Sequence, residues 1–254
     1  NDVEGLIFEL MGKDAGTCGG IGSSQHLCNK NFYSNGIQGG IMPVSAGMAF
    51  ANKLKKNNQI GLVFIGDGTL GQGLVYETLN IISLFEIPLL VVCEDNGYAQ
   101  STSKKVNLAG EIIPRAEAFG INTYQSDTWD LKELFDQAND SANFVRANCK
   151  PAFHLVKTYR LNHHSKSDDK RPEHEVENFE YKDPINIFRN KKNALYETYK
   201  SSVDSQIEEI VKKSDKKKEK DISDYIPIIT TNQSELRYTS LEKLNERVVN
   251  RINF

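Results

Sequence analysis

The sequence predicts an α/β protein with a mostly parallel sheet and helices on both of its faces. Two apolar runs of strand length, residues 60–65 (IGLVFI) and 89–93 (LLVVC), flank a segment whose apolar residues recur at helical spacing. Continuous runs of Val, Ile and Leu are typical of strands buried on both faces, and a helical crossover between two such strands makes them parallel. We therefore expect the polar residues after each run at the carboxyl edge of the sheet, where open α/β sheets bind ligands.

Each of these two strands is followed by a polar cluster that suits a diphosphate and a metal ion. The clusters are residues 66–68 (Gly-Asp-Gly) and residues 95–97 (Asp-Asn-Gly). Glycine lets the backbone turn and approach a ligand closely, and the helix that follows directs free N–H groups at an anion. Asp67 and Asn96 supply the oxygen ligands that Mg²⁺ takes together with phosphate. Either cluster alone also fits an ordinary turn, but the pair predicts a diphosphate–Mg²⁺ site.

The stretch from residue 66 to residue 102 resembles the thiamine-diphosphate motif, in which Gly-Asp-Gly is followed further along the chain by a paired-Asn element. More narrowly, it is similar to the α subunit of the 2-oxo acid dehydrogenase decarboxylases, those for pyruvate, branched-chain 2-oxo acids and acetoin. The resemblance implies the thiamine-diphosphate-binding fold, with Mg²⁺ held by the side chains of Asp67 and Asn96 and the backbone carbonyl of Tyr98. The cofactor-binding residues that it implies within this motif are Asp67, Gly68, Thr69 and Asn96.

One residue of this motif departs from the family. Asp95 stands where the first Asn of the pair is usual. That first position is not a metal ligand in the family, so the implied Mg²⁺ ligands stay in place.

Composition argues against several classes of function. A chain of 254 residues with 39% hydrophobic residues can bury the core of one α/β domain with appendages. The net charge of -3 argues against a nucleic-acid partner, which would favour a basic face. No apolar run approaches the roughly eighteen residues that span a bilayer, and residues 1–10 lack a signal-peptide pattern. The four cysteines have no Cys-x-x-Cys spacing, so we expect reduced thiols in the cytoplasm, or in the mitochondrial matrix of a eukaryote.

Before the first strand, the chain reads as a helix, a Gly-rich loop and a second helix. The Gly-rich loop, residues 16–27, resembles the family's Gly-Gly-Ser-Met-His element, with His26 at the place of its His. From the residues alone, a loop histidine satisfied by nearby backbone explains His26 better than a ligand does. The resemblance implies that the backbone at Gly36 and Gln38 receives the aminopyrimidine ring of the cofactor.

Two further helices have sequence signals at their starts. Pro43 is expected at the first position of the helix before the first strand. After the motif, residues 115–158 read as helix, strand, helix and strand, and Asp130 is expected to cap the second of these helices. The apolar face expected for that helix consists of Leu131, Leu134, Phe135 and Ala138.

A basic loop follows the last of these strands, at the predicted ligand edge. Residues 158–169 (TYRLNHHSKSDD) contain Arg160 and the adjacent His163 and His164. Two adjacent histidines without further ligands make a poor zinc site, so phosphate contact and proton transfer fit better, with a solvated surface loop as the alternative. The segment closely resembles the family's Tyr-Arg-x-Gly-His-His-Ser-x-Ser-Asp-Asp, with Asn162 in place of the Gly. The resemblance implies that Arg160 binds the diphosphate and that His164 is catalytic, near the reacting carbon.

We divide the chain into three parts. Residues 1–190 are expected to form a thiamine-diphosphate-binding α-type domain without the family's amino-terminal part, which carries cofactor contacts. Residues 191–235 read as a charged helix and linker. Residues 236–254 weakly resemble the start of the family's β subunit, which some members fuse to α. We therefore expect a fragment that is inactive alone.

The resemblance implies an enzyme that uses thiamine diphosphate and Mg²⁺. Its reaction would be the oxidative decarboxylation of a 2-oxo acid, with acyl transfer to a lipoyl-bearing acyltransferase in a multienzyme complex. The implied partner is a β subunit or fused β domain, in a heterotetramer or its equivalent. Two alternatives stay open. One is a thiamine-diphosphate carboligase without a lipoyl acceptor, for which the departures at Gln25, Gln38 and Asn162 leave room. The other is a non-catalytic diphosphate-binding module.

Overall fold

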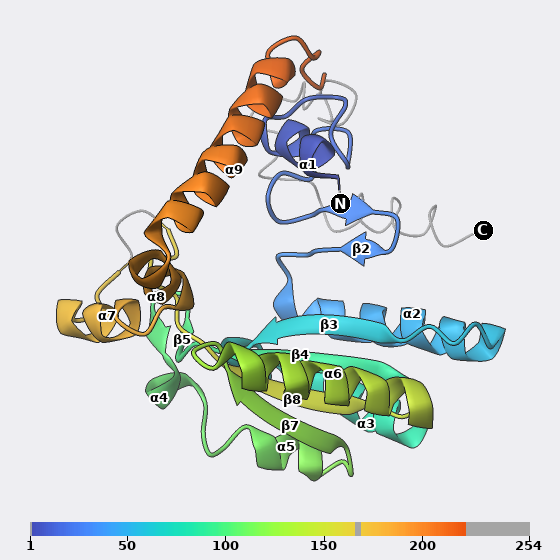
Figure 1. The fold of residues 1–254 in the computed structure, drawn as a ribbon. Helices are drawn as coiled ribbons and strands as arrows, with labels where there is room; N and C mark the ends of the chain where they lie inside the picture. The colour runs from blue at the N-terminus through green and yellow to red at the C-terminus, as the bar shows by residue number, and fades with distance from the viewer. Residues whose placement is uncertain (1, 166–168, 222–254) are drawn as a thin grey trace, which may run out of the picture.

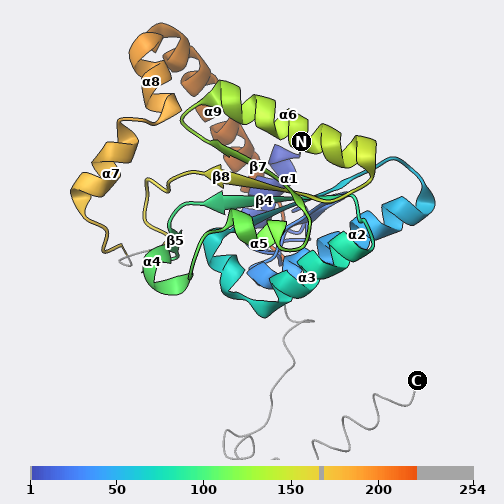
Figure 2. The same cartoon turned by 90° about the horizontal axis from the view of Figure 1, so that it is seen from below.

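A computed structural model describes residues 2–165 and 169–221 of the chain. Its centre is a four-stranded sheet in the order β3-β4-β8-β7, in which every neighbouring pair is parallel (Figure 1). The strands are β3 (Gly61–Gly66), β4 (Leu89–Asp95), β7 (Asn122–Asp127) and β8 (Ala152–Lys157). Figure 2 shows helices on both faces of the sheet, which confirms the predicted α/β class. One face carries α2 (Ile41–Lys55), α3 (Gly73–Leu84) and α5 (Ile113–Glu117), and the other carries α6 (Leu131–Asn148).

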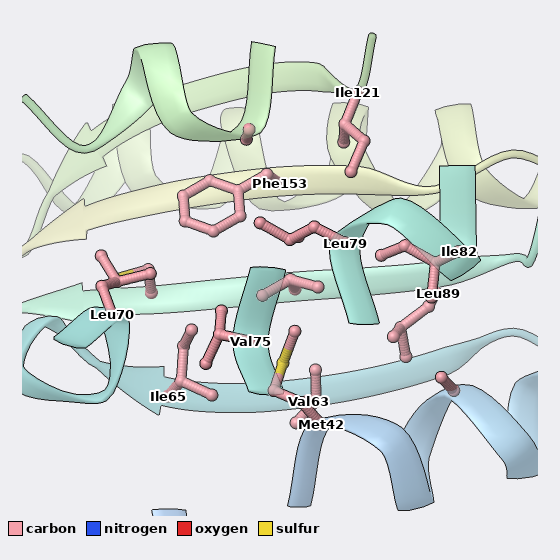
Figure 3. Close-up of a cluster of buried hydrophobic side chains, with 14 of the residues drawn as sticks. Met42, Val63, Ile65, Leu70, Val75, Leu79, Ile82, Leu89, Ile121 and Phe153 are labelled. Atoms are coloured by element: carbon pink, nitrogen blue, oxygen red, sulfur yellow. The ribbon is translucent and has the colours of Figure 1, made fainter. Parts of the chain in front are cut away.

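The larger hydrophobic core lies between the sheet and the helices α2, α3 and α5 (Figure 3). Fully burying a Val, Leu or Ile side chain stabilises a fold by about 1.5–3 kcal/mol. The residues that fill the centre of this core are Met42, Val63, Ile65, Leu70, Val75, Leu79, Ile82, Val91, Cys93 and Phe153. A smaller core of Leu90, Val92, Val145, Ala152 and Val156 lies under α6. These two cores hold the carboxyl ends of β3 and β4 in fixed positions.

The structure corrects the prediction that residues 60–65 are buried on both faces. Leu62 and Phe64 are 52% and 54% exposed, because β3 is an edge strand and α6 packs on β4, β7 and β8. The run from Leu89 to Cys93 is buried throughout, as predicted.

The predicted cap of α6 is confirmed, but of its predicted apolar face only Leu134 packs against the core. Asp130 Oδ1 accepts the N–H groups of Lys132 and Glu133, both at 3.0 Å. Leu131 and Phe135 are 58% and 68% exposed. The helix rests on the sheet through its second half, where Ser141 and Val145 are buried. The helix α2 also begins earlier than predicted, at Ile41 rather than Pro43, because the short helix η1 (Gln38–Gly40) leads directly into it.

The remaining elements surround this body. After β8, the helices α7 (Glu173–Glu180) and α8 (Pro184–Lys191) lead to the long helix α9 (Asn193–Ser214), which packs against α1 (Val3–Leu10) (Figure 1). The short elements are β1 (Cys28–Asn29), β2 (Phe32–Tyr33), η1 (Gln38–Gly40), η2 (Asp67–Gly71), β5 (Tyr98–Ala99), β6 (Thr102–Ser103) and α4 (Lys104–Asn107). In the part of the chain that the structure describes, every helix is too short or too polar to cross a bilayer. Residues 236–254 lie outside the described residues, and the three-part division of the chain stays a prediction.

Candidate functional site

The Gly-Asp-Gly turn at the end of β3 packs directly on the turn after β4. Asp67 opens η2 and is 1% exposed, and its Oδ2 accepts the N–H of Gly97 at 2.7 Å. A Cβ on Gly68 would lie 2.5 Å from the Cβ of Ala99, so the close approach of the two turns requires glycine at 68. The parallel pairing of β3 with β4 brings both turns to the same edge of the sheet.

Asn96 lies in the second turn, next to the residue that Asp67 contacts. Its Oδ1 accepts the N–H of Tyr98 at 2.9 Å, an Asx-turn that fixes the backbone here. Gly97 has a φ of 80°, in the left-handed region that favours glycine. The structure thus brings Asp67, Asn96 and Tyr98 to adjacent turns at the predicted edge. Their binding of Mg²⁺ stays a prediction.

The Asp67 carboxylate has a second carboxylate beside it. Burial, with the neighbouring Asp95 carboxyl, raises the pKa of Asp67 to about 6. Lys104 pairs with Asp95, at 2.5 Å from Nζ to Oδ2, whereas no ion pair of Asp67 occurs within the described residues. A buried carboxylate without a cation favours a bound metal ion as its partner. No group of three His, Cys, Asp or Glu side chains in the described ranges could hold a metal, so a metal at Asp67 would need amide and carbonyl oxygens as well.

The loop after β8 is fastened to this turn by a cluster of aromatic and charged side chains. Glu175 Oε1 on α7 accepts the hydroxyl protons of Tyr98 and Tyr159, at 2.8 and 2.9 Å. The Arg171 guanidinium lies over both rings, at 5.6 and 5.0 Å from their centroids, and pairs with Asp169 at 2.5 Å. Arg171 and Glu175 are not predicted from the sequence, since the charged run that contains them has no local signal beyond that of a surface helix.

Arg160 and His164 differ in how they are placed. Arg160 is half-buried, and it donates from Nη2 to the carbonyl oxygen of Gln100 at 2.8 Å and from Nε to that of Asn162 at 3.0 Å. It therefore joins the loop after β8 to the β5–β6 turn. His164 is exposed in the loop that follows the carboxyl end of β8, and its catalytic role stays a prediction.

The residues implied for the aminopyrimidine ring lie near the same edge. Gly36 and Gln38 are exposed, and Gln38 opens η1. The next residue, Gly39, lies so close to Gln72 that a Cβ there would meet Gln72 Oε1 at 1.8 Å. This contact places η1 beside η2 and the start of α3. His26 is exposed, and its N–H donates to the carbonyl oxygen of Gly22 at 3.0 Å.

Glu9 organises the Gly-rich loop. This role of Glu9 is not predicted from the sequence. Its side chain is buried in α1 and accepts N–H groups from Cys18 at 2.7 Å, Gly20 at 2.9 Å and Gly22 at 2.6 Å. Burial acts to raise the pKa of Glu9, but these backbone N–H groups outweigh it and hold the pKa below its ordinary value. The loop that carries His26 is therefore anchored from α1.

An apolar cavity of about 530 Å³ opens on the α6, α7 and α8 side of this edge. The cavity is lined by Thr128, Trp129, Leu131, Leu134, Thr158, Tyr159, Leu161, Phe179, Asp183, Pro184, Ile185 and Phe188. None of these residues belongs to the turns at 66–68 or 95–97, so the cavity is separate from the candidate metal site.

Comparisons with known proteins agree with this geometry. Residues 1–223 match the family described as Dehydrogenase E1 component. The chain is 37% identical over 214 residues to the pyruvate dehydrogenase E1 component subunit alpha of Rickettsia felis, covering 82% of this chain and 65% of that protein. The same subunit of Zymomonas mobilis is 36% identical over 174 residues, covering 67% of this chain and 49% of that protein. The testis-specific mitochondrial form of this subunit from Rattus norvegicus is 34% identical over 192 residues, covering 74% of this chain and 49% of that protein.

The chain spans about half to two thirds of the length of these relatives. A solved transketolase from Leishmania mexicana aligns at 17% identity with a TM-score of 0.43, over 54% of this chain and 22% of that one, a likeness too weak to bear on the fold. The family match covers most of the chain, including both turns and the loop after β8. The chain belongs to the dehydrogenase E1 component family.

Proposed function

We propose that this chain is the α-type part of a thiamine-diphosphate-dependent decarboxylase, which acts on a 2-oxo acid and passes the acyl group to a lipoyl-bearing acyltransferase. The observation that carries the proposal is the buried Asp67 carboxylate, which faces the Asn96–Tyr98 turn with a pKa raised to about 6. A divalent cation would relieve the repulsion between Asp67 and Asp95. The relatives named above are pyruvate dehydrogenase subunits, which supports pyruvate as the 2-oxo acid.

The residues present fit Mg²⁺ and a diphosphate. Asp67, Asn96 and the carbonyl of Tyr98 would hold the ion, because Mg²⁺ takes hard oxygen donors together with phosphate oxygens. Gly68 and Thr69 would approach the diphosphate through their backbone. Gly36 and Gln38 would receive the aminopyrimidine ring in the same way. The contact between Gly39 and Gln72 supports a shared site, since it joins the two backbone segments.

The bound cofactor would supply the carbon nucleophile and take up the electrons left by the departing CO₂. The chain's own residues would bind the cofactor, orient it and move protons. Among the described residues, Arg160 donates two of its five N–H groups to the carbonyl oxygens of Gln100 and Asn162, and a guanidinium can offer further N–H groups to a phosphate. His164 is exposed in the same loop and is suited to proton transfer once a partner covers the site.

The proposed enzyme needs a β-type partner, as a subunit or a fused domain, to supply the carboxylate that activates the cofactor. Phe32, Tyr33 and Ile37 are 60%, 53% and 67% exposed around Gly36, a surface that a partner would cover. We therefore infer a heterotetramer or its fused equivalent, and a chain that is inactive without the β-type partner.

Calorimetry on the chain assembled with its β-type partner tests the metal site. Asp67→Ala should abolish the Mg²⁺-dependent binding of thiamine diphosphate. Asp136→Ala is the matched control, because it removes an exposed carboxylate that pairs only with Lys132 on α6 among the described residues. Retained binding by Asp67→Ala would reject the assignment.

Turnover tests the role of His164. His164→Ala should lower the rate of lipoyl acylation far more than it weakens cofactor binding, and unchanged acylation would exclude the role. Product analysis with and without the lipoylated acyltransferase separates the proposed reaction from carboligation. A condensed product that forms without the acyltransferase would favour the carboligase.

A further inference from the structure

The Gly-rich loop brings two cysteines together. Cys18 and Cys28 are separated by ten positions in the sequence, and both thiols are free. The N–H of Cys28 donates to Cys18 Sγ at 2.8 Å, and the same sulfur lies 3.6 Å from the carbonyl oxygen of Cys28. The Cys18 sulfur therefore rests against the backbone of Cys28. The other two cysteines are placed differently: Cys93 is buried in the core, and Cys149 is exposed at the end of α6.

This arrangement meets one condition for a disulfide, because the sulfur of Cys18 lies against the backbone of Cys28. A disulfide requires two Cβ atoms about 3.5–4.5 Å apart, with the Cα atoms about 4.4–6.8 Å apart. A sulfur in contact with the backbone N of Cys28 is already near the Cβ of that residue, since N and Cβ are bonded to the same Cα. Formation of the bond requires the Cys28 side chain to rotate toward this sulfur. Cys28 is exposed on the two-residue strand β1, so its side chain has room to turn.

Both backbones are held in place independently of the sulfur contact. The N–H of Cys18 donates to the buried Glu9 carboxylate at 2.7 Å. Cys28 pairs with Tyr33 in the β1–β2 ladder. The approach of the two cysteines is thus built into the fold, and little ordering is needed to bring the sulfurs together.

We propose that Cys18 and Cys28 form a reversible disulfide when the protein meets a peroxide. Hydrogen peroxide oxidises the exposed Cys28 thiol to a sulfenic acid and releases one water. The Cys18 sulfur then attacks the sulfenic sulfur, forms the S–S bond and expels the oxygen as a second water. Two thiols lose two electrons and two protons, and the peroxide is reduced to two waters. A dithiol reductant restores both thiols.

The bond would close the loop that carries His26. Cross-linking the two ends restricts the conformations open to residues 19–27, which include the glycines held by Glu9. The proposed disulfide does not depend on the proposed function, because its geometry involves neither the Asp67 turn nor the loop after β8.

Peptide mapping of the full chain after peroxide treatment tests the proposal. Trypsin cleaves after Lys13 and Lys30, so residues 14–30 carry both cysteines in one peptide. We expect this peptide to lose the mass of two hydrogens and to regain it with dithiothreitol. Dimedone, which traps sulfenic acids, should label Cys28 strongly in Cys18→Ser and weakly in the unaltered chain. Exposed Cys149 is the internal control and should be labelled equally in both.

Unfolding provides a second control. At equilibrium in a glutathione buffer, the ratio of disulfide to dithiol should be at least about tenfold lower in denaturing urea than in the folded chain, because only loop closure then brings the sulfurs together. Two results would overturn the proposal: a residue 14–30 peptide that keeps its hydrogens while Cys149 reacts, or equal dimedone labelling of Cys28 with and without Cys18. A ratio of disulfide to dithiol that urea leaves unchanged would show that the folded geometry contributes nothing.

Discussion

Lys104 Nζ lies 2.6 Å from Oδ1 and 2.5 Å from Oδ2 of Asp95, so one ammonium group contacts both oxygens of the carboxylate. This pair explains how the chain accommodates Asp at a position where the resembling motif has Asn. The Asp95 side chain is only 9% exposed and lies beside Asp67. Without Lys104, two neighbouring carboxylates would share one poorly solvated edge of the sheet.

We predict that Lys104→Met lowers the free energy of unfolding of the metal-free chain by about 1–3 kcal/mol, less than for a fully buried pair because Lys104 is partly solvated. Asp95→Asn in the same chain should recover most of the loss, because the neutral amide needs no cation. Urea unfolding of the two single variants and the double variant measures this coupling. If the loss of unfolding free energy in the double variant equals the sum of the losses in the two single variants, Lys104 and Asp95 are energetically independent.

The raised pKa of Asp67 predicts how stability depends on pH. The folded metal-free chain binds this proton more tightly than the unfolded chain, in which the carboxyl has its ordinary value of 3.8. Stability from this group is therefore fully present below about pH 4 and is lost as pH rises through about 6.

Thermal unfolding of the unaltered chain and of Asp67→Asn measures this effect, because Asn cannot titrate. As the pH is lowered from about 7 to about 5, the unfolding temperature of the unaltered chain should rise relative to that of Asp67→Asn. A constant difference would show that the pKa of Asp67 is not raised. Mg²⁺ competes with the same proton, so Mg²⁺ affinity should fall below about pH 6.

The close approach at Gly68 predicts a pair of compensating substitutions. A Cβ there would lie 2.5 Å from the Cβ and 3.2 Å from the Cα of Ala99. We expect Gly68→Ala to destabilise the chain by about 1–3 kcal/mol, and Ala99→Gly in the same chain to restore part of the loss. Gly71→Ala is the control within η2, since a Cβ there meets nothing within 4 Å. If Gly68→Ala and Gly71→Ala unfold at the same urea concentration, the two turns do not constrain each other.

The shared acceptor Glu175 predicts that the loop after β8 and the candidate metal turn are coupled. Glu175→Ala leaves the hydroxyl groups of Tyr98 and Tyr159 without their acceptor, at a cost of about 1–3 kcal/mol. It should also speed the exchange of amide hydrogens around Tyr98, as hydrogen exchange read by mass spectrometry would show. Glu177→Ala removes an exposed carboxylate from the same helix and should change neither quantity. Unchanged exchange in Glu175→Ala would mean that the turn holds its shape without α7.

The sequence by itself determined the parallel sheet and the edge at which the candidate site lies. The runs at 60–65 and 89–93, and the polar residues that follow them, are contiguous signals of strands and turns. Parallel pairing then requires Asp67 and Asn96 to reach one edge, because both follow the carboxyl ends of neighbouring strands. The Asp130 cap was predictable for the same reason, since its partners are two and three residues away.

Only the tertiary structure decided which surfaces are buried and which distant groups meet. Periodicity shows that a face is apolar but not what covers it, so Leu62, Phe64, Leu131 and Phe135 were expected inside and lie exposed. The contacts of Glu9 with the Gly-rich loop, of Lys104 with Asp95, and of Glu175 with Tyr98 join residues separated by nine or more positions. Such contacts depend on where the folded chain places each element, and no local pattern of residues specifies that.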